Sequence, residues 1–120
     1  MNSLYHIYLI SDATGETLDR IFIAIKAQFK NIDYKIHTYS FTRTSNQILN
    51  ILENAEKSKN VIILYSIVDS NLAKYLAKTS NEKKLPCFGV LGDLILSFSK
   101  LLNQKASHQP SGQYILNDEY

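Results

Sequence analysis

The sequence has little of what usually marks a metal, redox or disulfide-bonded protein. Its 120 residues include three histidines and one cysteine. The histidines are far apart in the sequence and match neither H-x-x-x-H nor H-E-x-x-H, so we expect no metal site. A single cysteine cannot form an internal disulfide. Cys87, in the segment Leu-Pro-Cys-Phe-Gly-Val, is predicted to be an inert thiol at the start of a buried strand.

Charge and long apolar runs are scarce as well. The 13 basic and 11 acidic residues leave a net charge of +2, and the lysines are scattered, which argues against a nucleic-acid partner. No stretch approaches the roughly 18 continuous apolar residues of a membrane span. The amino terminus lacks a charged flank followed by a signal-type apolar run. We therefore expect a cytoplasmic protein without a membrane partner.

Glycine is too sparse for the known phosphate-binding loops. Gly15, Gly89, Gly92 and Gly112 fit neither G-x-G-x-x-G nor G-x-x-x-x-G-K-[ST]. The serine-hydrolase elbow G-x-S-x-G does not occur either. Motifs therefore supply no dinucleotide fingerprint, no P-loop and no catalytic triad, and we expect no cofactor bound by this chain.

What the sequence does contain is a strand, a polar turn and a helix over residues 5–29. Residues 5–10 are apolar without clean alternation, which is typical of a strand covered on both faces. Turn residues follow at 12–15, and in an open α/β sheet ligands bind at such a turn, beyond the carboxyl end of the strand. One face of the predicted helix collects Leu18, Ile21, Phe22, Ile25 and Phe29.

Three more strands alternate with helical patterns along the chain. They are predicted over residues 34–41, 61–68 and 86–91. Residues 61–68 form the most apolar run and are therefore predicted to be the central strand, beside residues 5–10. The alternation predicts an α/β fold, a Rossmann-like open parallel sheet of about four strands with helices on both faces and strand order 2-1-3-4.

The periodic pattern ends near residue 103. Residues 104–120 are polar or turn-forming apart from Tyr114, Ile115 and Leu116. We therefore expect an α/β domain over residues 1–103, and a linker or tail over 104–120 that is mobile or loosely packed until another domain supplies a partner surface.

The turn from Ser11 to Thr17 is the best candidate for a functional site. Its hydroxyls, carboxylates and backbone N–H groups at a helix amino terminus can hold a phosphate or orient a hydroxyl. The alternative is simple capping, with Thr14 as the N-cap, Gly15 for close packing and Glu16 complementing the helix dipole. Glu16 argues against a bound phosphate because its carboxylate repels an anion, and spacing alone favours capping.

Two more charged residues are predicted at the same edge of the sheet. Arg43 follows the second strand and can form a fork for a carboxylate or phosphate, with an ordinary surface arginine as the alternative. Asp69 follows the central strand within a polar rim, where N-capping is the alternative. The candidate functional surface consists of Ser11, Asp12, Thr14, Gly15, Glu16, Thr17, Arg43 and Asp69.

Three strings of residues occur in order along the chain. They are Ile-Tyr-Leu-Ile-Ser-Asp-Ala-Thr-Gly-Glu-Thr, Ile-Leu-Tyr-Ser-Ile-Val-Asp and Pro-Ser-Gly-Gln-Tyr-Ile-Leu-Asn-Asp-Glu-Tyr. Together they resemble the amino-terminal part of the pyruvate, phosphate dikinase regulatory proteins and the related phosphoenolpyruvate synthase regulatory proteins. The resemblance covers essentially all 120 residues, and the first two strings are specific in combination.

The resemblance implies a bifunctional bacterial enzyme. Such an enzyme is an ADP-dependent serine/threonine kinase that inactivates the dikinase by phosphorylating a threonine near its catalytic histidine. It is also a phosphate-dependent phosphorylase that reverses this step and releases pyrophosphate. The implied partners are the dikinase or the synthase and a P-loop kinase-like domain, in cis or in trans. The family's Gly-to-Ser-Lys-Thr nucleotide loop has no counterpart in these 120 residues, so no nucleotide-binding residue can be assigned.

Two hypotheses remain open at this point. In the first, the chain is the part of a kinase/phosphorylase without the P-loop, from a split gene or a truncated protein, and an adjacent reading frame with the P-loop part would favour it. In the second, it is a non-catalytic Rossmann-like binding module or the product of a decaying gene. Under both, we expect residues 1–120 alone neither to bind ADP tightly nor to transfer phosphate.

Overall fold

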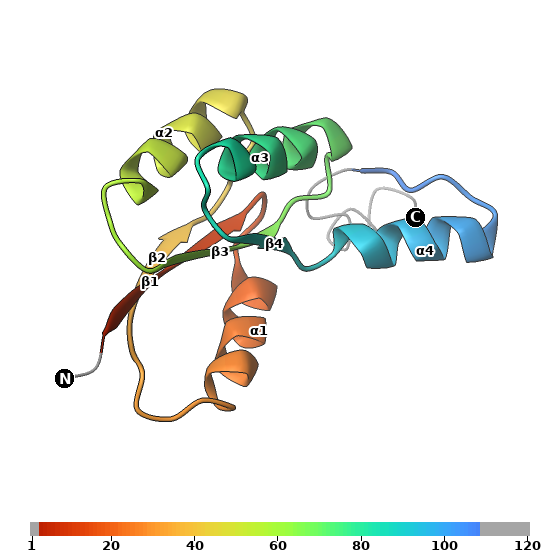
Figure 1. The fold of residues 1–120 in the computed structure, drawn as a ribbon. Coiled ribbons are helices and arrows are strands. Elements are labelled where there is room, and N and C mark those ends of the chain that lie inside the picture. The colour runs from red at the N-terminus through yellow and green to blue at the C-terminus, as the bar shows by residue number, and fades with distance from the viewer. Residues whose placement is uncertain (1–2, 109–120) are drawn as a thin grey trace.

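A computed structural model describes residues 3–108, in which four strands alternate with four helices (Figure 1). The strands are β1 (Leu4–Ser11), β2 (Asp33–Tyr39), β3 (Val61–Ser66) and β4 (Cys87–Gly89). The helices are α1 (Glu16–Lys26), α2 (Ser45–Ala55), α3 (Ser70–Glu82) and α4 (Gly92–Leu102).

All strand pairs are parallel, and the order is β2-β1-β3-β4, which confirms the predicted fold class and strand order. The apolar run of β3 lies beside β1, and the register places Ser11 opposite Ser66. The carboxyl ends of the two central strands therefore meet at one edge of the sheet. Three strands are shorter than predicted, since β2 ends at Tyr39, β3 at Ser66 and β4 at Gly89. Phe41 leaves the extended conformation at φ 53°, and Pro86 precedes β4.

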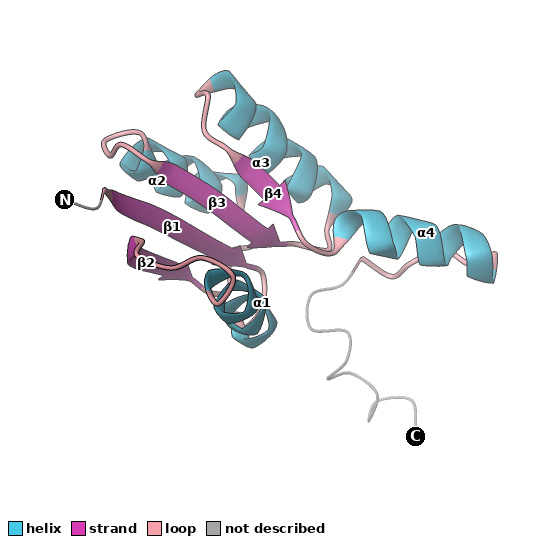
Figure 2. Ribbon diagram, turned by 60° about the horizontal axis from the view of Figure 1, so that its bottom comes forward, coloured by secondary structure: helices cyan, strands magenta, loops and turns pink. Residues whose placement is uncertain are grey.

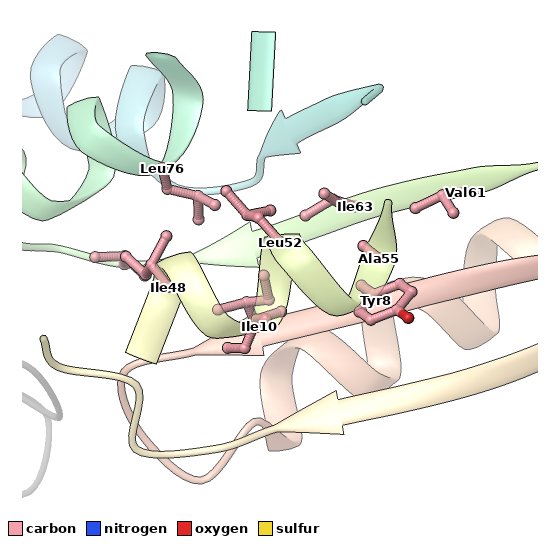
Figure 3. Packing of buried hydrophobic residues seen from close by; sticks show 10 residues of the cluster. Tyr8, Ile10, Ile48, Leu52, Ala55, Val61, Ile63 and Leu76 are labelled. Carbon is pink, nitrogen blue, oxygen red and sulfur yellow. The ribbon is translucent and has the colours of Figure 1, made fainter. Parts of the chain in front are cut away.

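One face of the sheet is closed by α2 and α3 (Figures 1 and 2). Thr44 caps α2 in a reciprocal capping box with Gln47, so the local sequence fixes where that helix begins. Figure 3 shows the side chains of Ile48 and Leu52 lying between the sheet and Leu76 of α3. These side chains are buried in one cluster with the sheet residues Tyr8, Ile10, Val61 and Ile63.

Of the four helices within residues 3–108, α1 alone lies on the opposite face, as Figure 1 shows. Leu18 and Phe22 are buried against Ile7, Leu9 and Leu64, so the first half of α1 packs on the sheet. The helix ends at Lys26, before Phe29, and the predicted stripe was therefore too long. Ile25 is 40% exposed and Phe29 is 60% exposed, so the end of the predicted stripe leaves the sheet.

The fourth helix covers neither face and extends away from the edge of the sheet (Figure 2). None of its residues is buried, and Phe98 and Leu101 are 59% and 83% exposed. After Asn103, at φ 53°, the chain turns back, and a ring nitrogen of His108 lies 2.8 Å from the carbonyl oxygen of Val68. Residues 109–120 lie outside the described residues, so the predicted loose packing of the tail stays a prediction. None of the helices within residues 3–108 is long and apolar enough to cross a membrane.

Candidate functional site

The carboxyl ends of β1 and β3 border a small polar pocket of about 80 Å³. The chain leaves β1 toward α1 on one face and leaves β3 toward α3 on the other, so the pocket lies where the connections change sides. Ligands of open α/β sheets bind at this topological switch point. The lining residues are Ser11 to Leu18 of the β1–α1 turn, together with Ser66, Val68 and Leu91.

Asp12 is the buried acid of this pocket, with 3% of its surface exposed. Its carboxylate Oδ2 accepts a hydrogen bond from the Val68 N–H at 2.8 Å, and its own N–H donates to the Ser66 carbonyl at 3.2 Å. Burial raises the pKa of the Asp12 carboxyl, and the nearby Asp69 charge adds to this rise. The backbone hydrogen bonds and the Arg43 charge oppose the rise without cancelling it. Asp12 therefore binds a proton more readily than an ordinary aspartate does.

Arg43 lies beside the turn, as predicted for the end of the second strand. Its Nε donates to the backbone carbonyl of Asp12 at 2.9 Å, and its guanidinium lies 5.5 Å from the ring centroid of Phe41. This bond to a backbone carbonyl is not the predicted fork for a carboxylate or phosphate, which stays a prediction. The Nε bond leaves the terminal nitrogens of the guanidinium as the part that can approach a bound anion.

The segment after β2 holds the turn in place through its backbone. The N–H of Phe41 donates to the Ala13 carbonyl and the N–H of Thr42 donates to the Ser11 carbonyl, each at 2.9 Å. The Ser40 hydroxyl donates to the Thr14 carbonyl at 2.7 Å. Three successive residues of this segment thus hold the turn in one conformation.

The predicted N-cap of α1 is wrong by one residue. Gly15 is the N-cap, at φ 90°, and no side chain caps the helix. Thr14 Oγ1 accepts from the Glu16 N–H only at 3.4 Å, because the left-handed residue lies between the threonine and the helix. The N–H groups at the start of α1 therefore lack a side-chain cap at the point where the helix borders the pocket.

The remaining candidates lie at the rim. Glu16 and Thr17 are exposed in the first turn of α1, where Glu16 adds negative charge at the pocket. Asp69 is exposed and caps α3, accepting from the Leu72 N–H at 3.0 Å, as the capping alternative predicted. Six of the eight candidates line the pocket, Arg43 is attached to it through Asp12, and Asp69 follows the lining residue Val68.

Sequence reasoning missed two features of this site. The backbone of Val68 is contacted at its N–H by Asp12 and at its carbonyl by His108, which is 40 residues away in the chain. Neither Val68 nor His108 belongs to a sequence motif, and His108 lies in a segment without periodicity. Leu91 also lines the pocket, yet it reads in the sequence as the end of an apolar strand.

The histidines are not all far apart once the strands pair. His6 Nδ1 and His37 Nε2 lie 3.0 Å apart across β1 and β2, and the His37 ring stacks on Tyr8. Within residues 3–108, no group of three or more histidine, cysteine, aspartate or glutamate residues could hold a metal ion. Cys87 is partly buried, and burial raises the pKa of its thiol, in keeping with an unreactive thiol.

The fold and the pocket define a Rossmann-like α/β protein with a polar switch-point site. Its family follows from sequence comparison, because the kinase/pyrophosphorylase family profile matches residues 7–120. The chain belongs to this family.

Curated relatives agree with the family match. A protein of Pelagibacter ubique (strain HTCC1062), provisionally named as a pyruvate, phosphate dikinase regulatory protein, is 66% identical over 120 residues, which are 100% of this chain and 44% of the relative. A protein of Geotalea uraniireducens (strain Rf4) with the same provisional name is 39% identical over 117 residues, covering 98% of this chain and 43% of the relative. The chain thus spans less than half the length of these relatives.

Proposed function

We propose that this chain supplies the amino-terminal α/β part of a regulatory enzyme that phosphorylates a threonine of pyruvate, phosphate dikinase with ADP and removes that phosphate with inorganic phosphate. The family match over residues 7–120 is the observation that carries this proposal. The provisional names of the relatives support the dikinase as the target, with phosphoenolpyruvate synthase as the alternative target.

The switch-point pocket is the proposed contribution of this chain to that reaction. At about 80 Å³ it is far smaller than the roughly 300–1,000 Å³ of a drug-sized ligand site, so it fits a phosphate or a side-chain hydroxyl but not an adenine nucleotide. In this role Asp12 orients the hydroxyl of the target threonine or takes up its proton, for which its raised pKa is suited.

ADP binding belongs, in this proposal, to the part of the relatives that extends beyond the matched region. Phosphoryl transfer depends on a cradle of N–H groups, a lysine and a metal ion held beside the phosphates. Here Asp12 and Glu16 both line the pocket beside the amino terminus of α1, and their charges oppose an anion there. A P-loop domain, in cis or in trans, is therefore the required partner.

The test uses this chain alone and joined to the remaining part of the Pelagibacter relative. Calorimetry with Mg-ADP measures binding, and phosphothreonine detection on the dikinase measures transfer. We expect no micromolar affinity and no transfer by residues 1–120, and transfer by the joined chain. Micromolar ADP affinity or transfer by residues 1–120 alone would contradict the assignment of ADP binding to the other part.

A matched pair of variants tests the pocket in the joined chain. Asp12→Asn keeps the shape of the side chain and removes its charge and its titration, so we expect phosphate transfer to fall at least about tenfold. Glu53→Gln changes an exposed carboxylate on α2 and serves as the control, with unchanged transfer. Equal activity of Asp12→Asn and the parent would remove Asp12 from the mechanism. Binding of the dikinase without any transfer by the joined chain would favour the non-catalytic binding module.

A further inference from the structure

An apolar surface of the sheet lies open in a groove on the α1 face. It has a volume of about 490 Å³ and runs between α1 and the strands. Its lining is apolar and aromatic, and the tyrosine hydroxyls are its only polar side-chain groups among the described residues. The lining residues that matter here are Phe22, Ile25, Ile62, Leu64, Phe88 and Val90.

This groove exists because only the first half of α1 reaches the sheet. Phe22 is buried, whereas Phe88 of β4 is 57% exposed on the same face. Parallel sheets are normally covered by helices on both faces, because the crossover connections place them there. Within residues 3–108, no helix covers this side of β3 and β4 as α3 covers the other side.

The fourth helix does not fill this space. The segment after it first turns at the end of α4, where the Ser99 hydroxyl donates to the Gln104 carbonyl at 2.6 Å. It then reaches the end of β3, where His108 contacts the Val68 carbonyl. Figure 2 shows α4 beyond the edge of the sheet. The contact of His108 with Val68 brings the chain back to the carboxyl edge, where Val90, a lining residue of the groove, follows β4.

The length of the relatives indicates which part of the family protein is available to cover the groove. More than half of the Pelagibacter relative lies outside the region matched by this chain. The described part of the chain ends at His108, which contacts Val68 beyond the carboxyl end of β3. A small-molecule site would need several placed polar groups, which this lining does not offer. An apolar stripe of a helix needs none.

We propose that the groove between α1, β3 and β4 is the docking surface for an amphipathic helix from the carboxyl-terminal part of the family protein. The helix lies against Phe88 and Val90 on one side and Ile25 on the other, and completes the cover of the sheet. The ammonium group of Lys26 lies at the rim of the groove, since its Nζ is 5.9 Å from the ring centroid of the lining residue Tyr34. The docked helix therefore carries an acidic residue beside its apolar stripe.

The proposal rests on family membership and not on the proposed chemistry of the pocket. It is tested by thiol labelling in a Cys87→Ala background, with Phe88→Cys in the groove and Lys57→Cys in the exposed turn after α2 as the matched control. Each variant is prepared as residues 1–120 and as the chain joined to the remaining part of the Pelagibacter relative. Circular dichroism and light scattering confirm that each protein is folded and give its oligomeric state.

We expect the thiol at position 88 to react at least about tenfold more slowly in the joined chain than in residues 1–120, and the thiol at position 57 to react equally in both. Equal rates at position 88 would overturn the proposal. Slow labelling already in residues 1–120 would also overturn it, with a dimer indicating a second copy as the occupant and a monomer indicating α4. The readout needs no phosphoryl transfer, so an inactive joined chain with a protected groove would refute only the proposed function.

Discussion

The two faces of the sheet differ in how completely they are covered. On the α2/α3 face, ten buried residues form one cluster, whereas the α1 face has five and an open groove beside them. Both faces present apolar strand residues, so the difference lies in the helices and not in the sheet. The α2/α3 face therefore supplies most of the stability of this chain, and the α1 face is the surface left for another part of the protein.

The largest expected effect comes from truncating one large side chain on each face. Leu52→Ala removes a fully buried side chain and should lower the free energy of unfolding by about 2–5 kcal/mol. Phe88→Ala removes a larger side chain that is mostly exposed and should cost about 1 kcal/mol or less. Urea unfolding measures both. Equal losses at the two positions would show that the α1 face is closed as well.

A smaller effect is expected at the turn that starts α1. Gly15 has φ 90°, so Gly15→Ala should destabilise the fold by about 1–2 kcal/mol through backbone strain. The matched control is Gly92→Ala at the start of α4, where an added Cβ meets nothing within 4 Å. It should be neutral or stabilising by about 0.4–1 kcal/mol. Thermal unfolding of both variants tests this, and a neutral Gly15→Ala would contradict the left-handed N-cap.

Asp12 links the elements on the two faces of the sheet. It lies in the turn before α1, and its carboxylate accepts a hydrogen bond from the N–H of Val68, in the segment that leads to α3. Its pKa in the folded state is above the unfolded value of 3.8, so the folded protein binds a proton at Asp12 more tightly than the unfolded chain does. Protonated Asp12 therefore adds to stability below pH 3.8, and this gain is lost as the pH rises through the folded pKa. Asp12→Asn should remove this part of the pH dependence. Unfolding of both proteins across the acidic range measures it, and parallel profiles would show that Asp12 is not perturbed.

The smallest effect is expected at His37, at the margin of the closed face. Burial lowers its pKa below the unfolded value of 6.5, and the charges of His6 and Lys35 lower it further. The folded state therefore favours the neutral ring, and stability should fall as the pH drops below about 6.5. His37→Gln should flatten this fall, with Phe88→Ala as a control that leaves the slope unchanged. An equally steep profile for His37→Gln would place the titration elsewhere.

The sequence predicted the strands and their order better than the packing of the helices on the sheet. The unbroken apolar run of residues 61–68 was enough to predict a central strand, because few other arrangements bury both of its faces. The apolar stripe of Leu94, Phe98 and Leu101 lies on α4, but an amphipathic pattern does not tell what a helix packs against. That choice depends on the contacts of residues 104–108, which show no local pattern.

The candidate site shows the same limit. The turn and Arg43 could be placed at one edge because carboxyl ends of parallel strands meet there. The sequence does not predict which atoms pair. The side chain of Arg43 binds the backbone carbonyl of Asp12. Gly15 takes the place of Thr14 as the N-cap because of its left-handed backbone conformation. The contact of His108 with Val68 depends on the path of the chain after α4.

Amide hydrogen exchange of residues 1–120 tests the difference between the two faces most directly. The amides of Val61 to Leu64 and of the buried turns of α2 and α3 should open only near the global free energy of unfolding, since they belong to the closed core. The amides of α4, which has no buried residue, should exchange orders of magnitude faster. Protection of α4 equal to that of α2 would contradict this difference between the two faces. It would mean that α4 packs on the α1 face of the sheet and that no other helix is needed to cover it.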